Sequence, residues 1–327
     1  MKLTMAAGLL AVLVAGCGAA GPAARPAAPQ PWTPGTIEAP IRYAELDNGR
    51  WTLSAFTAKQ AKVDATGNAS GDERGWRYDL PVTDAGGWVP LTGTAQVRLS
   101  PALSADGHRL AYYSTAQRRF VARDLRTGVT RTLSPVVDAT ARDISDPPRV
   151  SPGGELFAVP YGNEILLTDF RTGRTRSLPG FRSLLGLTDT SIIASPEAID
   201  DDEPANAAVI TLSLSGQERS RVTVDAAHLG AISPDGRHMA STSGDRLRLT
   251  TLATGDQTAE VRLRPLAEPV AATVEHWLSP TKVLVNATTP DTDEFVGHFA
   301  LDIATGKGER VKNLPQDDDG LAFGALG

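Results

Sequence analysis

The sequence predicts an all-β fold built from repeated four-stranded antiparallel units. Three observations support this prediction: short alternating apolar runs, two turn sequences that flank them, and the recurrence of the whole pattern along the chain. Gly and Pro, at 31 and 23 of the 327 residues, supply the tight turns that such a fold needs. The clearest copy of the unit is ISPDGRHMASTSGDRLRLTTLATG, residues 232–255.

Each turn in this copy has a physical cause. Pro234 suits the second position of a type I turn because its φ is fixed at about −65°, and Gly236 follows at the fourth position. A Thr-Gly pair ending at Gly255 supplies the left-handed residue that closes a short hairpin. Between the turns, Leu247 and Leu249 alternate with arginines, which predicts a half-buried strand.

Five copies of the unit follow one another along the chain. Four are clear, at residues 103–133, 150–178, 228–263 and 278–311, and a degenerate copy occupies 187–195 and 207–224. The glycines of the second turn lie 39 to 51 residues apart, at Gly128, Gly173, Gly216, Gly255 and Gly306. Four strands cannot bury both faces of their sheet alone, and four strands per ~40–45 residues is typical of a β-propeller, whose blades pack radially.

The remaining segments are expected to complete the ring. IRYAEL, RWTLSAF, WRYDLPV and GWVPLTG, within residues 37–97, predict four strands of a first blade, and the C-terminal GLAFGALG predicts a strand that closes the ring against it. Dividing roughly 290 residues by ~45 gives six or seven four-stranded antiparallel blades, with seven preferred because the degenerate regions hide turns. An open array of five repeats is the alternative.

Two known repeat families resemble these copies. The third clear copy resembles a WD40 repeat, with His228, a Ser-Pro-Asp-Gly turn and a strand that ends in Thr-Gly. It departs from that family where Thr250 and Thr251 replace the Trp-Asp pair. Copies containing SPGG and DLRTG are similar to the TolB-type propellers of bacterial envelopes. The resemblance covers residues 98–312 and implies the fold, but it implies little about function because propellers host many activities.

The N-terminus predicts export and a lipid anchor. MKLTMAAGLLAVLVAGC has one cation, Lys2, followed by an apolar run that is too short to span a bilayer. It ends in VAGC, which resembles a bacterial lipobox and implies that residues 1–16 are a signal peptide and that Cys17 is lipidated. Cys17 is the only cysteine, so it has no partner for an internal disulfide. The alternative is an ordinary signal peptide cleaved after a nearby small residue.

Composition supports the same localisation and excludes one class of partner. Residues 17–36, an Ala/Pro-rich stretch after the signal peptide, predict a linker, and 37–327 predict the propeller domain. The anchor would hold the domain at the outer face of the cell membrane.

A bias of 26 arginines over six lysines indicates a high-GC genome of the actinobacterial type. The net charge of −6 gives no basis for nucleic-acid binding, and we expect a monomer.

Motifs for catalysis are weak in this sequence. H-E-x-x-H, paired cysteines and G-x-S-x-G are all missing, so we assign no catalytic residue, no cofactor and no metal ligand. His228 with Asp225 invites comparison with a serine triad, but a structural hydrogen bond to a turn is the favoured interpretation. Zinc binding is the less favoured interpretation for the histidines, which we expect at turns or on the surface: His108, His228, His238, His276 and His298.

Acidic clusters and tryptophans leave two alternatives open. Residues 200–203, 291–294 and 317–320 are either solvated acidic loops, which we favour, or a structural Ca²⁺ site. Tryptophans make either blade-packing contacts, which we favour, or a sugar- or peptide-binding surface: Trp32, Trp51, Trp76, Trp88 and Trp277.

Taken together, these features predict a cell-surface lipoprotein whose β-propeller is a protein-interaction or ligand-binding scaffold and not an enzyme. The expected partner is an envelope or extracellular protein. The alternative is a hydrolase or lactonase-type propeller enzyme with a metal in its central channel. That alternative requires acidic or histidine side chains from several blades to converge on the axis.

Overall fold

The computed structural model describes residues 40–47, 50–55, 70–72, 75–79, 88–90, 96–98, 100–137, 146–197, 206–263, 271–289, 292, 294–311, 314 and 321–324. The chain divides into two compact units, Met1–Pro31 and Trp32–Gly327. All described residues belong to the second unit. The predicted signal peptide, Cys17 and the linker lie outside the described residues.

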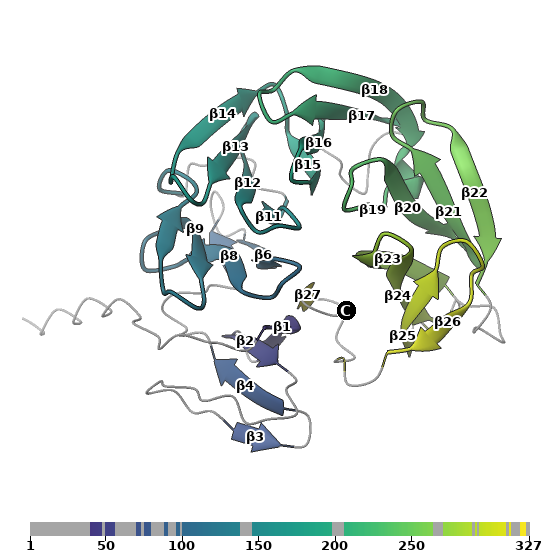
Figure 1. Ribbon diagram of the computed structural model, residues 1–327, viewed down its shortest axis with the longest axis horizontal. Coiled ribbons are helices and arrows are strands. Elements are labelled where there is room, and N and C mark those ends of the chain that lie inside the picture. Colours follow the sequence, from purple (N-terminus) through teal and green to yellow (C-terminus); the bar gives the residue numbers. More distant parts are fainter. Residues whose placement is uncertain are drawn as a thin grey trace, which may run out of the picture. The chain divides into compact units, whose positions relative to one another are not determined.

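Strands dominate the described part of the chain (Figure 1). Its only helix is the short 3₁₀ turn Ala226–His228. Within the described residues, no helix has both the length and the apolar character needed to cross a membrane.

Five four-stranded antiparallel sheets follow one another in the sequence, and each forms one blade (Figure 1). Blades 1 and 2 are β7 (Ala102–Leu103), β8 (Arg109–Ser114), β9 (Arg119–Asp124), β10 (Thr130–Thr132), then β11 (Arg149–Val150), β12 (Leu156–Tyr161), β13 (Glu164–Asp169), β14 (Thr175–Pro179). Blade 3 is β15 (Ser183–Leu187), β16 (Ser191–Ser195), β17 (Asn206–Ser213), β18 (Glu218–Asp225). Blades 4 and 5 are β19 (Ala231–Ile232), β20 (His238–Ser243), β21 (Arg246–Thr251), β22 (Gln257–Arg262), then β23 (Ala271–Ser279), β24 (Lys282–Thr288), β25 (Phe295–Asp302), β26 (Gly308–Arg310).

These five blades coincide with the five repeat copies. The described residues therefore confirm an all-β propeller of four-stranded antiparallel blades, but the predicted number of six or seven is wrong, since they form five. In residues 37–97, three of the four predicted strands of a first blade do form, but they join a five-stranded sheet that also contains the C-terminal strand.

The two ends of the chain form a five-stranded sheet, which we call the terminal sheet. Its order is β27 (Leu321–Phe323), β1 (Tyr43–Asp47), β2 (Arg50–Ala55), β4 (Gly75–Asp79) and β3 (Ser70–Asp72). The predicted closing strand is confirmed, because β27 pairs antiparallel with β1 and places Phe323 opposite Tyr43. GWVPLTG does not join this sheet; it supplies β5 (Trp88–Pro90), which pairs with β6 (Gln96–Arg98) in a separate hairpin.

The terminal sheet bridges blades 1 and 5. On one side, the N–H of Ile41 donates to the carbonyl of Gly107 at 2.9 Å. Gly107 has a φ of 68°, and a Cβ there would lie 2.2 Å from the carbonyl oxygen of Ile41, so only glycine allows this approach. On the other side, the ring of Phe323 lies between two histidines of blade 5, with centroid distances of 6.2 Å to His276 and 6.0 Å to His298.

Apolar side chains fill the spaces between neighbouring blades. Phe120 of blade 1 and Phe157 of blade 2 are fully buried in one shared cluster. Trp277 of blade 5 packs in the cluster that it shares with blade 4, and its indole N–H donates to the carbonyl of Ala231 at 2.9 Å. Each blade therefore buries its faces against its neighbours, as the repeat pattern predicts.

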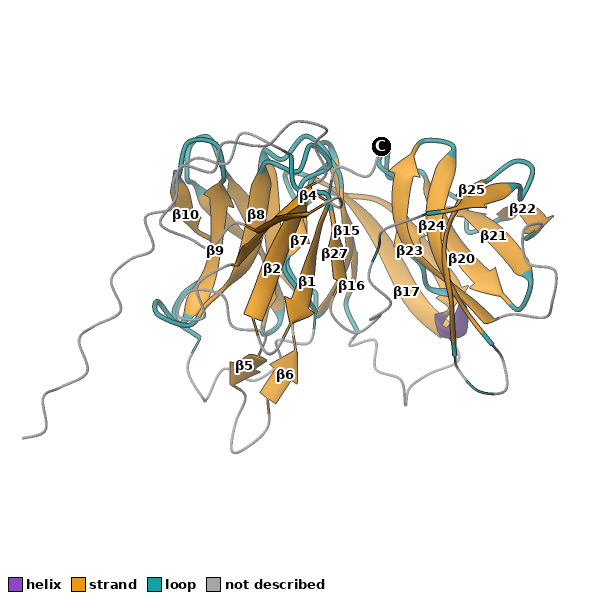
Figure 2. Cartoon of the chain, turned by 90° about the horizontal axis from the view of Figure 1, so that it is seen from below, coloured by secondary structure: helices purple, strands orange, loops and turns teal. Residues whose placement is uncertain are grey.

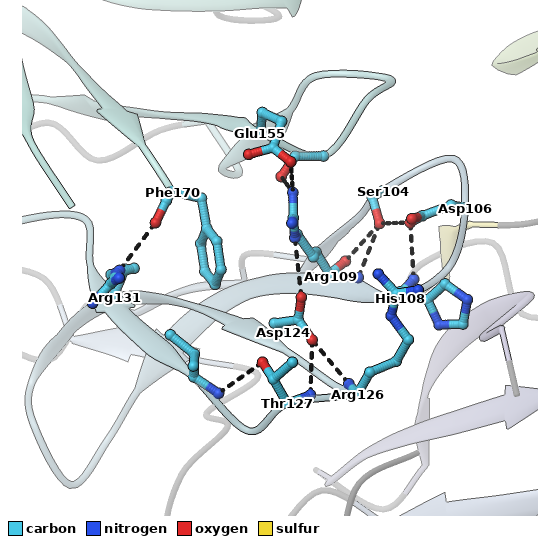
Figure 3. A network of polar contacts seen from close by, with 12 residues as sticks. Ser104, Asp106, His108, Arg109, Asp124, Arg126, Thr127, Arg131, Glu155 and Phe170 are labelled. Carbon is cyan, nitrogen blue, oxygen red and sulfur yellow. Dashed lines mark hydrogen bonds and ion pairs between the residues drawn. The ribbon is translucent and has the colours of Figure 1, made fainter. Parts of the chain in front are cut away.

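Side-chain hydrogen bonds explain the first turn of the repeat. In blade 4, the N–H of Gly236 donates to the carbonyl of Ser233 at 2.8 Å, which confirms the predicted turn. The hydroxyl of Ser233 donates to Asp235 at 2.6 Å and accepts from the N–H of His238 at 2.9 Å. Blade 1 repeats this arrangement with Ser104 and Asp106 (Figure 3).

An aspartate cap explains the second turn. Asp124 accepts a hydrogen bond from the N–H of Thr127 at 2.9 Å, and Asp302 accepts one from the N–H of Thr305 at 2.9 Å. In blade 4, Thr251 stands at this position in place of the aspartate, and the N–H of Gly255 donates to the carbonyl of Thr251 at 2.8 Å. The five glycines of this turn all have positive φ, as predicted: Gly128, Gly173, Gly216, Gly255 and Gly306.

Arg109 ties blade 1 to blade 2 (Figure 3). Its guanidinium lies 3.3 Å from Asp124 and 2.8 Å from Glu155, and it donates to the carbonyl of Gly154 at 2.7 Å. Burial alone would raise the pKa of Asp124, but hydrogen bonds from Thr127 and the charge of Arg109 outweigh burial and lower it. The side chain of Asp124 is only 6% exposed, so this carboxylate depends on Arg109 for its countercharge.

Replacing Arg109 by Ala is expected to lower the free energy of unfolding by about 2 kcal/mol, because a largely buried carboxylate loses its partner. Arg237→Ala is the control, since Arg237 is 80% exposed and lies 3.9 Å from Asp235. The control should change stability by less than about 0.5 kcal/mol. Urea unfolding followed by circular dichroism measures both variants, and equal losses would contradict the role given to Arg109.

Candidate functional site: the central channel

The inner strands, which lie toward the centre of the arc of blades in Figure 1, line a central channel, and this channel is the candidate functional site. It contains two cavities of about 250 Å³ each. The inner strands of all five blades line the first cavity, while blades 1, 2 and 5 and strand β27 line the second. Five residues line both cavities, and we call them the channel waist: Leu103, Arg149, Val150, Glu275 and His276.

Charged and titratable side chains of the waist come from two blades. Arg149 belongs to β11 of blade 2, whereas Glu275 and His276 belong to β23 of blade 5. Neighbouring residues line the first cavity together on several inner strands, as at Arg149 and Val150 of β11 and at Glu275 and His276 of β23. The register of β23 shifts between Val274 and His276.

Arg149 is an exposed residue that borders the hollow part of the channel, and none of the described residues forms a hydrogen bond or ion pair with it. The carboxylate of Asp146 acts on its charge and favours the protonated guanidinium. Within the described part of the chain, no hydrogen bond or ion pair engages its guanidinium, while an oxygen of Asp146 accepts the N–H of Leu184 at 2.9 Å.

His276 is neutral at neutral pH. Burial, followed by the positive charge of Arg149, lowers the pKa of His276 from 6.5 to about 4. Its ring also packs near Phe323 of the closing strand. His276 therefore contacts both the channel and the junction that closes the ring.

Three of the five histidines lie where the sequence predicts. His108 and His238 follow their Asp-Gly turns at the start of β8 and β20. His228 has its Nδ1 3.1 Å from Asp225 and its Nε2 2.7 Å from Arg248. A serine of a triad would need that Nε2, so the structural interpretation of His228 is favoured.

For His276 and His298 the expectation of a turn or surface position is wrong. His276 lines the channel, and His298 on β25 is 2% exposed. Each lies on a strand of blade 5 that packs toward the terminal sheet, which has no counterpart in the repeat pattern.

The metal-enzyme alternative required three acidic or histidine side chains from several blades. Among the described residues, no group of three or more His, Cys, Asp or Glu side chains is placed to hold a metal ion. Of the waist residues, Glu275 and His276 have suitable ligand atoms, and both come from one strand. That the chain is not an enzyme stays a prediction.

Most residues of the acidic clusters lie outside the described part of the chain. This holds for 200–203, for 317–320 and for Asp291 and Asp293, so a Ca²⁺ site there stays untested. Glu294 is described, and its N–H donates to the hydroxyl of Thr289 at 3.0 Å.

Of the five tryptophans, Trp277 is 5% exposed and packs between blades, as the favoured interpretation predicts. Trp32 lies outside the described residues, and the other three are placed only by their strands, β2, β4 and β5. A binding surface made by those four tryptophans stays an alternative.

Arg149 is the residue that the sequence analysis missed. The repeat itself marks it: ALSADG, RVSPGG and AISPDG are aligned turns, and Arg149 stands where the others have Ala102 and Ala231. The strand registers agree, because each of the three residues lies opposite an alanine of the next strand. Comparing the copies position by position would have singled out Arg149.

No family model matches the chain, and no curated protein matches it. Several solved structures share its general arrangement. A chain of a nidogen/laminin complex has 12% identity and a TM-score of 0.47, covering 87% of this chain and 97% of that one. The Cps50 (Swd1) β-propeller domain of Myceliophteria thermophila has 17% identity and a TM-score of 0.42, covering 69% and 70%. TolB of Acinetobacter baumannii has 16% identity and a TM-score of 0.38, covering 84% and 66%. Likenesses this low assign neither a family nor an activity to the chain.

Acidification is expected to destabilise the protein through His276. The unfolded chain takes up a proton as the pH falls through 6.5, whereas the folded protein does so only near pH 4. The stability due to neutral His276 is therefore complete above pH 6.5 and is lost progressively toward pH 4. His276→Gln should reduce this loss, and Arg149 and Glu275 stay in place in this variant.

Thermal melts at several pH values between 4 and 7.5 measure this dependence. If the His276→Gln and wild-type melting temperatures fall in parallel, burial of neutral His276 does not contribute to acid sensitivity.

Proposed function

We propose that this chain is a lipid-anchored binding protein of the bacterial cell envelope, and that its β-propeller presents a ligand or partner site without performing chemistry. The observation that supports this most is the central channel. Inner strands from five blades surround a waist that contains Arg149 and His276, with apolar side chains among the cavity walls. Concave, largely apolar sites with a few fixed polar groups are typical of binding sites.

Support for the anchor comes from the sequence alone. A lipidated Cys17 would insert acyl chains whose buried CH₂ groups contribute about 0.8 kcal/mol each, enough for stable anchoring with two chains. The Ala/Pro-rich linker, at ~3 Å per residue when extended, would hold the propeller tens of ångströms from the membrane. On this proposal the partner is an envelope or extracellular protein.

Charges on an outer edge support a monomeric propeller. In blade 4, Arg262 pairs with Asp245 at 2.8 Å, and Arg246 pairs with Glu260 at 3.4 Å. These residues flank β22, the outermost strand of the blade. Charged side chains on an edge strand oppose strand pairing between molecules.

Replacing Cys17 by Ser tests the anchor. The variant should appear in the medium or the soluble envelope fraction without lipid, because its only thiol is lost. Fractionation of cells and mass spectrometry of the N-terminal peptide measure this. Thr4→Ser, a mild change within the same predicted signal peptide, is the control and should stay in the membrane fraction with its lipid. A Cys17→Ser variant that stays in the membrane fraction would refute the lipobox interpretation.

Photo-crosslinking on intact cells tests where the partner binds. A p-benzoylphenylalanine at Ala105, an exposed residue that lines the channel, should give a discrete crosslinked species. The same residue at Thr132, exposed on the outer strand of the same blade, is the matched control and should give none. Mass spectrometry identifies the adduct, and a species formed only from Thr132 would contradict the channel as the contact site.

A further inference from the structure

We infer that Arg149 forms a carboxylate-binding site at the waist of the central channel, for ligands with a small apolar body. This inference rests on the proposed binding function and names the class of ligand that the channel takes. The carboxylate comes either from a free organic acid or from the C-terminus of a partner peptide, since both present the same group.

Blade architecture does not require an arginine at this position. The equivalent residues of blades 1 and 4 are Ala102 and Ala231, and all three positions pair with an alanine of the following strand. Arg149 is exposed at the channel, so its side chain is not needed to fill the interior of the blade. The repeat therefore folds with alanine here, and the arginine needs a different explanation.

The guanidinium has unused hydrogen-bonding capacity. It carries five N–H donors in a planar fork, and no hydrogen bond or ion pair engages it within the described part of the chain. Asp146, a carboxylate whose charge acts on Arg149, accepts the N–H of Leu184. Arg149 lines both cavities, so its donors border the hollow part of the channel.

The surroundings favour a carboxylate over a phosphate. A carboxylate matches the guanidinium fork with two parallel hydrogen bonds and carries a single charge. Glu275 lies at the same waist, and its negative charge opposes a doubly charged phosphate more than a singly charged acid. His276 is uncharged at neutral pH and adds no positive charge that would favour a polyanion.

The walls favour a small apolar body next to that carboxylate. Besides the waist, the first cavity is lined mainly by apolar side chains such as Leu185, Ile232 and Val274. Each cavity has a volume of about 250 Å³, which is below the usual size of a site for a drug-sized ligand, ~300–1,000 Å³. A branched short-chain acid or the last residues of an apolar peptide suits this space.

Isothermal titration calorimetry of the purified full chain tests the inference. The probes are 4-methylpentanoate, the pentapeptide Ala-Ala-Val-Ala-Leu with a free carboxylate, the same peptide as its C-terminal amide, and inorganic phosphate. We expect binding of the acid, the free-carboxylate peptide or both, and none of the amide. Acid alone indicates a metabolite source, whereas peptide alone indicates a partner C-terminus.

Variants of Arg149 provide the residue-level test. Arg149→Ala should weaken carboxylate binding about 10–100-fold, the loss expected for charge-assisted hydrogen bonds. It should still fold, because alanine occupies the equivalent positions, and a wild-type circular dichroism spectrum checks this. Arg149→Lys should restore binding only in part, since it keeps the charge but loses the fork. Arg174→Ala, an exposed arginine of the same blade, is the control and should bind like wild type.

Three results would overturn the inference: equal binding of the amide, binding unchanged by Arg149→Ala, or tighter binding of phosphate than of every carboxylate. Failure of all probes to bind at millimolar concentration would overturn it as well. The crosslinking experiment at Ala105 is independent of these probes. A crosslinked partner together with failed probes would reject the carboxylate site and leave the proposed binding function standing.

Discussion

The rest of the structure depends on the need of each four-stranded sheet to bury both faces against another sheet. A blade such as β8–β9 of blade 1 is apolar on both sides, and its faces leave water only when neighbouring sheets cover them. Blades 2, 3 and 4 find these neighbours through repetition. Blades 1 and 5 have no further copy beside them, so the terminal sheet takes that place with Tyr43 and Phe323. The side view in Figure 2 shows β27 and β1 side by side in this sheet.

The ring formed by the blades and the terminal sheet is hollow along its axis. The inner strands β7, β11 and β19 have only two residues each, so little backbone reaches toward the centre. The inner strand of blade 5, β23, is much longer, carries a bulge and supplies Glu275 and His276 to the channel. The site therefore arises where two blades depart from the pattern of the others: blade 2 through one arginine, and blade 5 through a longer, bulged strand.

The sequence predicted what local chemistry determines. The Ser-x-Asp-Gly turns, the five glycines with positive φ and the buried pair Leu247 and Leu249 all follow from turn geometry and strand alternation, and the structure confirms them. It did not predict the number of blades, because chain length does not reveal which strand pairs with which. GWVPLTG has the pattern of a blade strand, yet β5 pairs with β6 in a local hairpin, and strand alternation alone does not reveal which partner a strand takes. A comparison between the repeat copies would have identified Arg149 from the sequence. Its position near His276 could not be predicted, because blades 2 and 5 meet at the same channel only in the folded ring.

His276 lies both at the central channel and at the junction that closes the ring. On one side its ring is affected by the charge of Arg149, and on the other it packs near Phe323 of the closing strand. The register of β23 shifts beside this residue, between Val274 and His276. His276 is uncharged at neutral pH and adds no second positive charge to the waist. It also packs near Phe323, in the strand that completes the ring. In this fold, the electrostatics of the channel and the stability of the junction cannot be changed independently at this position.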